Sequence, residues 1–160
     1  MIFGMTGMHT SGFDRLVRAL DGYALEHPDR DVLIQAGSSK YRPRKAGAFA
    51  YKADLREEID AADIVVSQGS IGFLDALRLG KRLVVVPRLE RFGEAIDDHQ
   101  VAFSRSFSAR YGFPVVMEIS DLGRAIDQAA TGPAPRAILF ESASPLHGEL
   151  AAYLAGLASR

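Results

Sequence analysis

The sequence has 160 residues, 48% of them hydrophobic and 24% charged, a composition typical of one folded globular domain. Nineteen Lys and Arg residues against twenty Asp and Glu residues give a net charge of −1, so no overall basic field attracts nucleic acid. The absence of Cys excludes disulfides, thiolate catalysis and Cys-ligated metals, and no apolar run approaches the roughly 20 residues that span a bilayer.

Strand and helix signals alternate along the chain, which is typical of a parallel sheet covered by helices. Apolar strands are predicted over residues 1–5 and 31–36, and the apolar residues between them recur at helical spacing over residues 13–27. The later predicted elements are strand 48–52, helix 54–62, strand 64–67, helix 73–79, strand 83–87, helix 97–111, strand 115–119 and helix 120–130, capped by Ser120 or Asp121. The predicted fold class is therefore α/β, a Rossmann-like parallel sheet with helices on both faces.

The end of the chain is predicted to be a separate tail. Residues 131–135 (TGPAP) are the predicted linker, and residues 145–157 have the pattern of an amphipathic helix. We therefore divide the chain into a domain of residues 1–130 and a tail of residues 131–160. The tail helix packs either on the same domain or on a partner.

Two glycine-rich turns follow predicted strands, at residues 6–12 (TGMHTSG) and 68–72 (QGSIG). A strand that leads into such a turn at a helix N-terminus leaves backbone N–H groups pointing at one spot, which favours an anion such as a phosphate. The G-x-G-x-x-G spacing is absent, and the strand over 31–36 ends without an acid for the ribose of NAD. Gly80-Lys81 lacks the spacing of a P-loop. A tight turn without a ligand is the alternative for residues 6–12.

Three stretches together, GMTGMHTSGFDRLVRALD, VLIQAGSSKYRP and DALRLGKRLVVVPRLERFGEAIDDHQ, resemble the glycosyltransferase family 28 C-terminal domain. More narrowly, they resemble the small subunits of two-part glycosyltransferases, such as the catalytic subunit of the eukaryotic dolichol-linked N-acetylglucosaminyltransferase and its bacterial relatives in exopolysaccharide and capsule assembly. The resemblance covers roughly residues 1 to 130. Its specific part is the run PRL-x-x-x-G-E-x-x-DDHQ.

The resemblance implies the nucleotide-sugar-binding half of a GT-B enzyme. It assigns donor binding to Thr6, Gly7, His9, Thr10, Gln68, Gly69, Ser70, Gly72, Asp75, Arg88, Leu89, Asp98 and Gln100. The two turns would approach the diphosphate, and Asp75 would take the ribose hydroxyls. Backbone around Arg88 and Leu89 would hold the uracil, and Asp98 and Gln100 would face the sugar hydroxyls.

Each of these assignments has a simpler alternative. Asp75 is otherwise a solvated helix acid, and His9 is otherwise a turn residue. One of Asp97 and Asp98 is expected to cap the following helix while the other binds the sugar.

The sequence departs from the family pattern at the second turn. Relatives carry Ser-His there, whereas this chain has Ser67-Gln68 and a turn one residue shorter. Because Gln carries no charge and shuttles no proton, we expect Gln68 to act only as a neutral donor.

The implied reaction transfers a sugar from a UDP-sugar to a lipid-linked saccharide acceptor in exopolysaccharide synthesis, with inversion and without a cofactor or metal. A membrane-associated partner subunit would supply the acceptor site. The catalytic base belongs either to that partner or to this chain, where His9 is the candidate. The N-terminus lacks the apolar stretch of a signal peptide, so we expect a cytoplasmic protein that its partner recruits to the inner face of the plasma membrane. The alternatives are a non-catalytic nucleotide-binding or scaffold subunit, and a small dehydrogenase.

The donor sugar stays open between glucuronic acid, galactose and N-acetylglucosamine. Glucuronic acid is favoured because an anionic donor would pair with Arg88, Arg91 or the basic loop of residues 37–47. That loop carries Lys40, Arg42, Arg44 and Lys45 at the end of a predicted strand, where ligands bind in such sheets. Its alternatives are a solvated loop and a contact with the diphosphate or the partner subunit.

Overall fold

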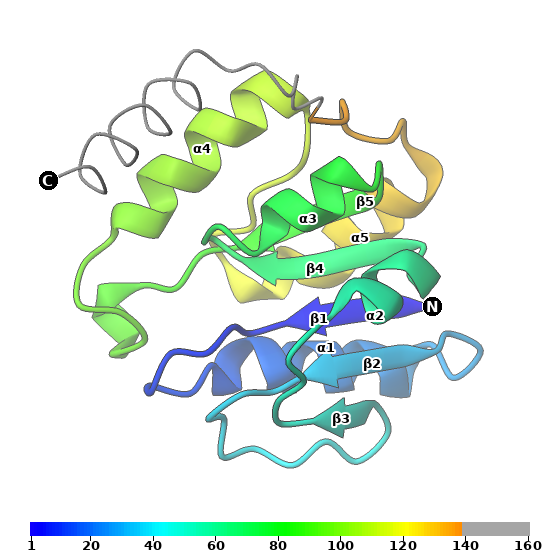
Figure 1. The fold of residues 1–160 in the computed structure, drawn as a ribbon. Coiled ribbons are helices and arrows are strands. Elements are labelled where there is room, and N and C mark those ends of the chain that lie inside the picture. Colours follow the sequence, from blue (N-terminus) through cyan, green and yellow to red (C-terminus); the bar gives the residue numbers. More distant parts are fainter. Residues whose placement is uncertain (139–160) are drawn as a thin grey trace, which may run out of the picture.

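Five parallel strands form the centre of the structure, which is a computed structural model that describes residues 1–138 (Figure 1). Their order across the sheet is β3-β2-β1-β4-β5. The strands are β1 (Ile2–Met5), β2 (Val32–Gln35), β3 (Gly47–Phe49), β4 (Ile64–Gln68) and β5 (Arg82–Val86). β1 and β4 are buried along their whole length, as expected for parallel strands with helices on both sides.

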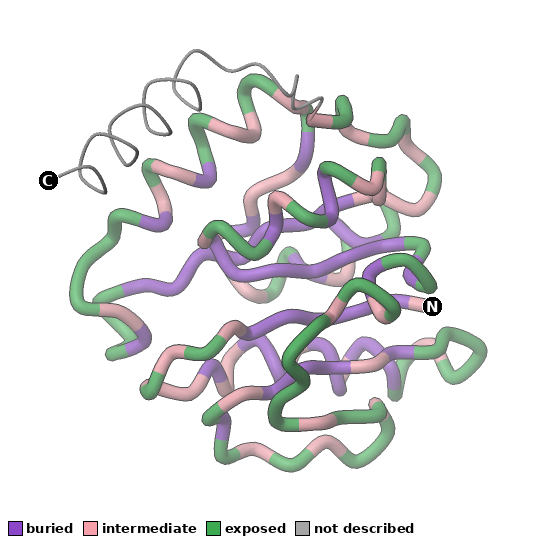
Figure 2. The backbone as a smooth tube through the Cα atoms, in the orientation of Figure 1, coloured by how far each residue is buried: buried purple, intermediate pink, exposed green. Residues whose placement is uncertain are grey.

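Helices cover both faces of this sheet. They are α1 (Asp14–Glu26), α2 (Arg56–Ala61), α3 (Phe73–Arg78), α4 (His99–Tyr111) and α5 (Leu122–Thr131), with short 3₁₀ turns η1 (Glu90–Phe92) and η2 (Ile119–Asp121). Neighbouring strand residues such as Ile64 and Val65 point to opposite faces and enter two separate cores. One core includes residues of α1 and α5, and the other includes residues of α2 and α3. The predicted α/β class, with a parallel sheet between two helical layers, is confirmed. Figure 2 shows the buried residues concentrated along the central strands.

The prediction of a sixth strand over residues 115–119 is wrong. Only Val115 pairs with the sheet, as an isolated bridge to Val85, and Val116 N–H donates to the Val85 carbonyl. The chain then bends at residues 117–118 and enters η2, so its backbone turns away before a second bridge forms.

The cap predicted for the helix over 120–130 is confirmed in its position, since Asp121 is the N-cap residue of α5, but not in its hydrogen bond. α5 begins at Leu122, and the side chain of Asp121 makes no capping hydrogen bond. Its carboxylate instead accepts a hydrogen bond from Arg124 Nη2 at 2.8 Å, since an i,i+3 pair lies on one face of the helix.

The predicted linker continues along the domain. After α5 ends at Thr131, the N–H of Arg136 donates to the carbonyl of Tyr111. Ile138 packs against the core on the α3 side. The predicted helix over 145–157 lies outside the described residues, and the division of the chain at residue 130 stays a prediction. Within residues 1–138, no helix is long and apolar enough to cross a membrane.

The strand order creates a crevice between β1 and β4. α1 leaves β1 toward one face of the sheet, and α3 leaves β4 toward the other. The two connections therefore diverge at the carboxyl ends of neighbouring strands. In open α/β sheets, ligands bind at such a switch point.

Asp21 holds the basic loop of residues 37–47 against α1. Its carboxylate is fully buried and accepts hydrogen bonds from the backbone N–H groups of Arg44, Lys45 and Ala46 and from the Tyr41 hydroxyl. Burial by itself raises the pKa of Asp21, but these four donors together outweigh it and lower the pKa to about 2. The loop backbone is thereby fixed, while its four cationic side chains stay exposed.

We expect Asp21→Asn to lower the free energy of unfolding at pH 7 by about 2 kcal/mol or more, because the variant loses an ionised acceptor. The folded pKa is depressed, so this stabilisation is present above the unfolded value of 3.8 and is lost as the pH falls to about 2. Urea unfolding should therefore show the difference between wild type and variant shrinking from pH 5 to pH 2. The exposed Asp31→Asn is the control, and an equal effect of both variants at pH 7 would contradict the assignment.

Candidate functional site

A hollow of about 490 Å³ opens at the crevice between the carboxyl ends of β1 and β4. We call it the crevice hollow. Its lining comes from the two glycine-rich turns, from the segment after β3 and from the first turns of α2 and α3. The lining residues are Met5, Gly7, Met8, Gln35, Tyr51, Lys52, Ala53, Asp54, Leu55, Ile59, Ser67, Gln68, Ser70, Gly72 and Asp75.

Five of the residues assigned to donor binding from the sequence share this lining, namely Gly7, Gln68, Ser70, Gly72 and Asp75. They come from two segments about 60 residues apart in the chain, and the parallel pairing of β1 with β4 places both segments at one edge of the sheet. The structure therefore brings the two predicted phosphate turns and the predicted ribose acid to one cavity.

The two turns approach each other most closely at Gly7 and Gln68. Gly7 has a φ of +75°, in the left-handed region that glycine adopts without strain. A Cβ atom at this position would lie 1.7 Å from Gln68 Nε2, so no other residue fits there while Gln68 keeps its place. Gly69 is required in a similar way, because its Cβ would lie 2.4 Å from Ser104 Oγ of α4.

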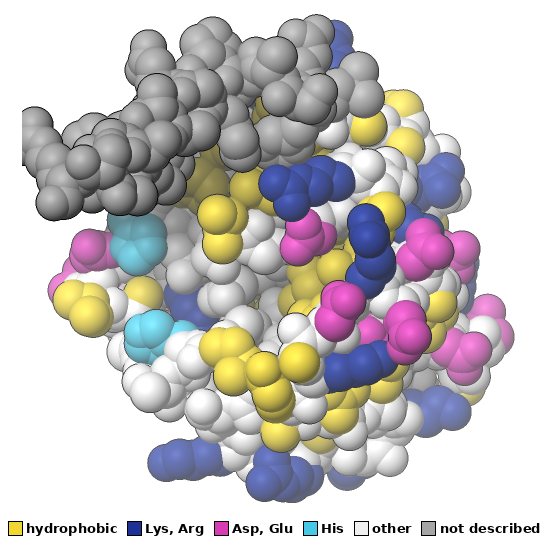
Figure 3. All heavy atoms as spheres, in the orientation of Figure 1, with side chains coloured by type: hydrophobic (Ala, Val, Ile, Leu, Met, Phe, Trp, Pro, Cys, Tyr) yellow, Lys and Arg dark blue, Asp and Glu magenta, His cyan; other side chains and the backbone are white. Residues whose placement is uncertain are grey.

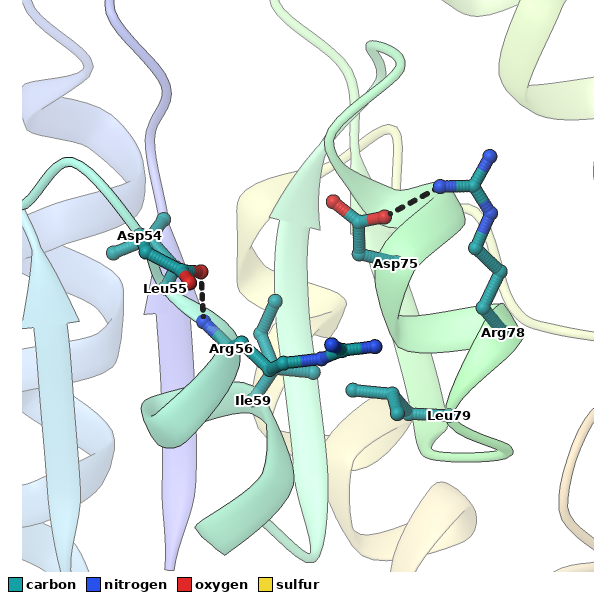
Figure 4. Close-up of a pocket in the computed structure, with 7 residues that line it drawn as sticks. All are labelled: Asp54, Leu55, Arg56, Ile59, Asp75, Arg78 and Leu79. Carbon is teal, nitrogen blue, oxygen red and sulfur yellow. Dashed lines mark hydrogen bonds and ion pairs between the residues drawn. The ribbon is translucent and has the colours of Figure 1, made fainter.

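Asp75 lies on the first turn of α3, facing α2 (Figure 4). Its side chain is 59% exposed, and one carboxylate oxygen accepts a hydrogen bond from Arg78 Nη1 at 2.9 Å. A smaller hollow of about 250 Å³ between α2 and α3 shares Asp75 with the crevice hollow. Because exposed ion pairs are weak, a ligand hydroxyl can compete for this carboxylate.

Arg88 follows β5 and is the largest fully buried side chain in residues 1–138, at 1% exposure. Its Nε donates to Gln68 Oε1 at 2.7 Å, and its Nη2 donates to the carbonyl of Thr6 at 2.8 Å. Its Nη1 donates to the carbonyls of Ser11, Gly12 and Glu94. Burial lowers the pKa of this guanidinium, and the Glu94 carboxylate opposes the shift. Arg88 thus ties the ends of β1, β4 and β5 together.

Glu94 completes this buried network. Its carboxylate accepts hydrogen bonds from Arg15 Nε at 2.9 Å and Nη2 at 2.8 Å, and from the N–H of Leu89 at 3.2 Å. The side chains of Arg15 and Glu94 are only 13% and 8% exposed. This bidentate pair fastens the segment after β5 to the first turn of α1.

Asp98 and Gln100 also hold that segment in place. Asp98 Oδ1 accepts a hydrogen bond from the N–H of Glu90 at 2.9 Å, and Gln100 Oε1 accepts one from the N–H of Arg88 at 3.1 Å. Asp97 accepts a hydrogen bond from the N–H of His99 at the start of α4, and bonds from His99 lower its pKa. Asp98 is the N-cap residue of α4, but its side chain makes no capping hydrogen bond, and Asp97 lies one residue earlier. A contact of Asp98 or Gln100 with sugar hydroxyls stays a prediction.

The other assigned residues lie around the first turn. Thr6 is fully buried, and its hydroxyl donates to the carbonyl of Gln35. His9 Nδ1 accepts a hydrogen bond from the N–H of Ser11. Thr10 lines a different hollow, of about 510 Å³, on the α1 side of the turn. The structure therefore places Thr6, His9 and Thr10 outside the lining of the crevice hollow.

Sequence reasoning missed the contribution of β2 and β3 to the cavity. Gln35 Oε1 accepts a hydrogen bond from the N–H of Gly7, and Tyr51, Lys52 and Asp54 line the side of the hollow after β3. Figure 3 shows basic and acidic side chains interleaved over this part of the surface. The topology alone could have indicated these residues, since the carboxyl ends of all parallel strands lie at the same edge of the sheet.

The comparison with protein families matches residues 1–142 to the glycosyltransferase family 28 C-terminal domain. Similar solved structures are the glycotransferase of kitacinnamycin (16% identity, TM-score 0.56) and the spinosyn rhamnosyltransferase SpnG complexed with thymidine diphosphate (17%, 0.54). A third is the glycosyltransferase SnogD from Streptomyces nogalater (17%, 0.50). They cover 81%, 81% and 98% of this chain, which in turn covers 34%, 37% and 43% of theirs. No curated protein matches the sequence.

Proposed function

Since the chain belongs to the family of the glycosyltransferase family 28 C-terminal domain, we propose that it binds a UDP-sugar in the crevice hollow as the donor-binding half of a glycosyltransferase. The observation that carries this proposal is the convergence of Gly7, Gln68, Ser70, Gly72 and Asp75 at the switch point of the sheet. SpnG, a similar fold, was solved with thymidine diphosphate, also a pyrimidine nucleoside diphosphate.

The chemistry of the hollow suits the parts of such a donor. A diphosphate requires N–H donors, which the amide of Gln68 and the backbone of the turn at residues 69–72 can supply. Vicinal ribose hydroxyls require an acceptor for two hydrogen bonds, and the exposed carboxylate of Asp75 has that capacity. The sugar would then extend toward the segment after β5.

The finer parts of the proposal concern the reaction. The sugar is transferred with inversion to a lipid-linked saccharide in exopolysaccharide synthesis, and a membrane-associated partner supplies the acceptor site and the base. The chain spans 34–43% of the length of the similar glycosyltransferase structures, which is consistent with one half of a two-part cleft.

Glucuronic acid remains the favoured donor sugar, with a revised cationic partner. The Arg88 guanidinium is enclosed by protein acceptors, so it does not meet a sugar carboxylate. Exposed cations take that place in the proposal, either Arg91 or the basic loop of residues 37–47. Arg91 is 54% exposed, and its ion pair with Glu118 lies at the surface.

The proposal is tested by calorimetric titration with UDP. We expect binding by wild type, and a loss of about 10- to 100-fold in affinity for Asp75→Ala, because hydrogen bonds to a charged group contribute about 1.5–3 kcal/mol. Asp121→Ala is a matched control, since Asp121 is 51% exposed and pairs with Arg124 at i,i+3 just as Asp75 pairs with Arg78. UDP that leaves the wild-type melting curve unmoved at millimolar concentration would overturn the donor site.

A non-catalytic scaffold role is the second candidate, because the described chain contributes only one wall of the expected cleft. The two roles separate when the chain is mixed with UDP-sugars, a lipid-linked acceptor and the membrane-associated subunit encoded beside it, and UDP release is measured. Release only in the mixture, and its loss with Asp98→Ala, supports the catalytic subunit. Full activity of the partner alone supports the scaffold, and binding of NADH but not UDP supports a dehydrogenase.

A further inference from the structure

The guanidinium of Arg88 donates hydrogen bonds to both glycine-rich turns, at Thr6 and Gln68. We propose that Arg88 is a positioning residue that orients the amide N–H₂ of Gln68 toward the donor diphosphate. This inference rests on the proposed function, because it needs a diphosphate in the crevice hollow. It assigns the buried cation an indirect role in recognition, through Gln68 rather than by contact with the ligand.

The direction of the Gln68 amide follows from the chemistry of its partner. A guanidinium donates hydrogen bonds and accepts none, so the atom of Gln68 that lies 2.7 Å from Arg88 Nε is the carbonyl oxygen Oε1. The amide nitrogen Nε2 therefore points the other way, toward Gly7, where a built Cβ atom would meet it at 1.7 Å. Gly7 and Gln68 both line the crevice hollow. The N–H₂ group is thus held at the wall of that cavity.

The side chain of Arg88 is itself held in place by several other contacts. Its guanidinium donates to main-chain carbonyls of Thr6, Ser11, Gly12 and Glu94 in addition to Gln68. It also lies over the ring of Phe13, with its central carbon 4.6 Å from the ring centroid. These partners come from the segments that follow β1 and β5, so both segments hold the guanidinium that orients Gln68.

This arrangement has two chemical consequences. An amide has no proton to gain or lose near neutral pH, so Gln68 remains a donor across that range. A cation bonded to the amide oxygen polarises the amide and strengthens its N–H groups as donors. The charge of Arg88 therefore favours an anion in the crevice while the guanidinium stays buried.

The test compares the affinities for UDP and for uridine, because their ratio isolates the diphosphate contribution. We expect Gln68→Met to lower the UDP affinity about 10-fold or more and the uridine affinity less than about twofold. In the otherwise wild-type protein, Arg88→Lys should lower the ratio of UDP affinity to uridine affinity by a similar factor. In the Gln68→Met variant, adding Arg88→Lys should lower this ratio by a factor at least about three times smaller, since the effects of two residues that act through one contact are not additive.

Arg82→Lys is the matched control. Arg82 is the first residue of β5, whereas Arg88 follows the carboxyl end of that strand. Its UDP-to-uridine ratio should equal that of wild type. An unchanged ratio in Arg88→Lys, or equal effects of Arg88→Lys in both backgrounds, overturns the inference while leaving the donor site intact. Absence of UDP binding by wild type overturns both.

Gln68→Glu keeps the test decisive if Arg88→Lys does not fold. Its carboxylate retains an oxygen for Arg88 and replaces the amide nitrogen with a second oxygen. We expect a melting temperature no lower than that of wild type and a loss of UDP affinity of about 30-fold or more, with uridine affinity unchanged. UDP affinity equal to that of wild type would show that the N–H₂ group does not meet the diphosphate.

Discussion

Gly7→Ala is expected to abolish measurable UDP binding and to lower the free energy of unfolding by about 2.5–5 kcal/mol. The residue has a φ of +75°, and a left-handed backbone costs an L-residue roughly 1–2 kcal/mol. The new Cβ would also displace Gln68 Nε2 and break the charge-assisted bond between Gln68 and Arg88, at a further cost of about 1.5–3 kcal/mol. Urea unfolding and titration with UDP measure the two effects.

Gly22→Ala is the control for the same substitution. Gly22 lies inside α1, and a Cβ built there meets no atom within 4 Å. Alanine at that position should stabilise the protein by about 0.5–1 kcal/mol, because glycine is the poorer helix residue. The two substitutions are therefore predicted to have opposite signs. A Gly7→Ala protein that is as stable as wild type and binds UDP would show that the two turns do not touch.

Glu94→Gln is expected to lower the free energy of unfolding by about 3–5 kcal/mol, because it leaves the buried charge of Arg15 without its carboxylate. The amide that replaces the carboxylate would also turn an N–H₂ group toward other donors, either Arg15 or the N–H of Leu89. Since the segment after β5 is anchored by this pair, UDP affinity should fall with stability. Chemical unfolding and calorimetric titration provide the two measurements.

The surface ion pair between Arg91 and Glu118 offers a matched control for this effect. Its N–O distance is 2.7 Å, against 2.8 Å between Arg15 and Glu94, but its side chains are 54% and 65% exposed. Glu118→Gln should change the unfolding free energy by less than about 1 kcal/mol, because solvent screens the exposed pair. Equal losses of unfolding free energy in Glu94→Gln and Glu118→Gln would contradict a larger contribution of the buried pair.

The elements of the fold were largely predictable, and the exceptions have local causes. The strands β1, β2, β4 and β5 are apolar runs bounded by turn residues, and the helix α1 carries apolar residues at regular spacing. Residues 115–119 have the same apolar character as those strands, yet only Val115 pairs with the sheet. Apolar character indicates burial, but it does not specify whether the backbone extends far enough to pair.

The candidate site was only partly predictable. Gly7, Gln68 and Asp75 were identified from turn composition and family resemblance, and the structure brings them to one cavity. The side chain of Arg88 was expected to pair with an anionic sugar, whereas it is buried against the two turns. The expected contact of the backbone around Arg88 with the uracil stays a prediction. Lys52 was missed, because the segment after β3 carries no motif of its own and joins the site only through the parallel sheet.

By itself, the sequence determined the alternating α/β order, the family and the two glycine-rich turns, because apolar spacing and turn chemistry act between residues close together in the chain. Only the tertiary structure decided which polar side chains face the crevice and which support it from beneath. Arg88 meets Thr6, 82 positions away, and Gln68, 20 positions away. The direction of a buried donor depends on acceptors at such separations, and these are placed only when the strands pair.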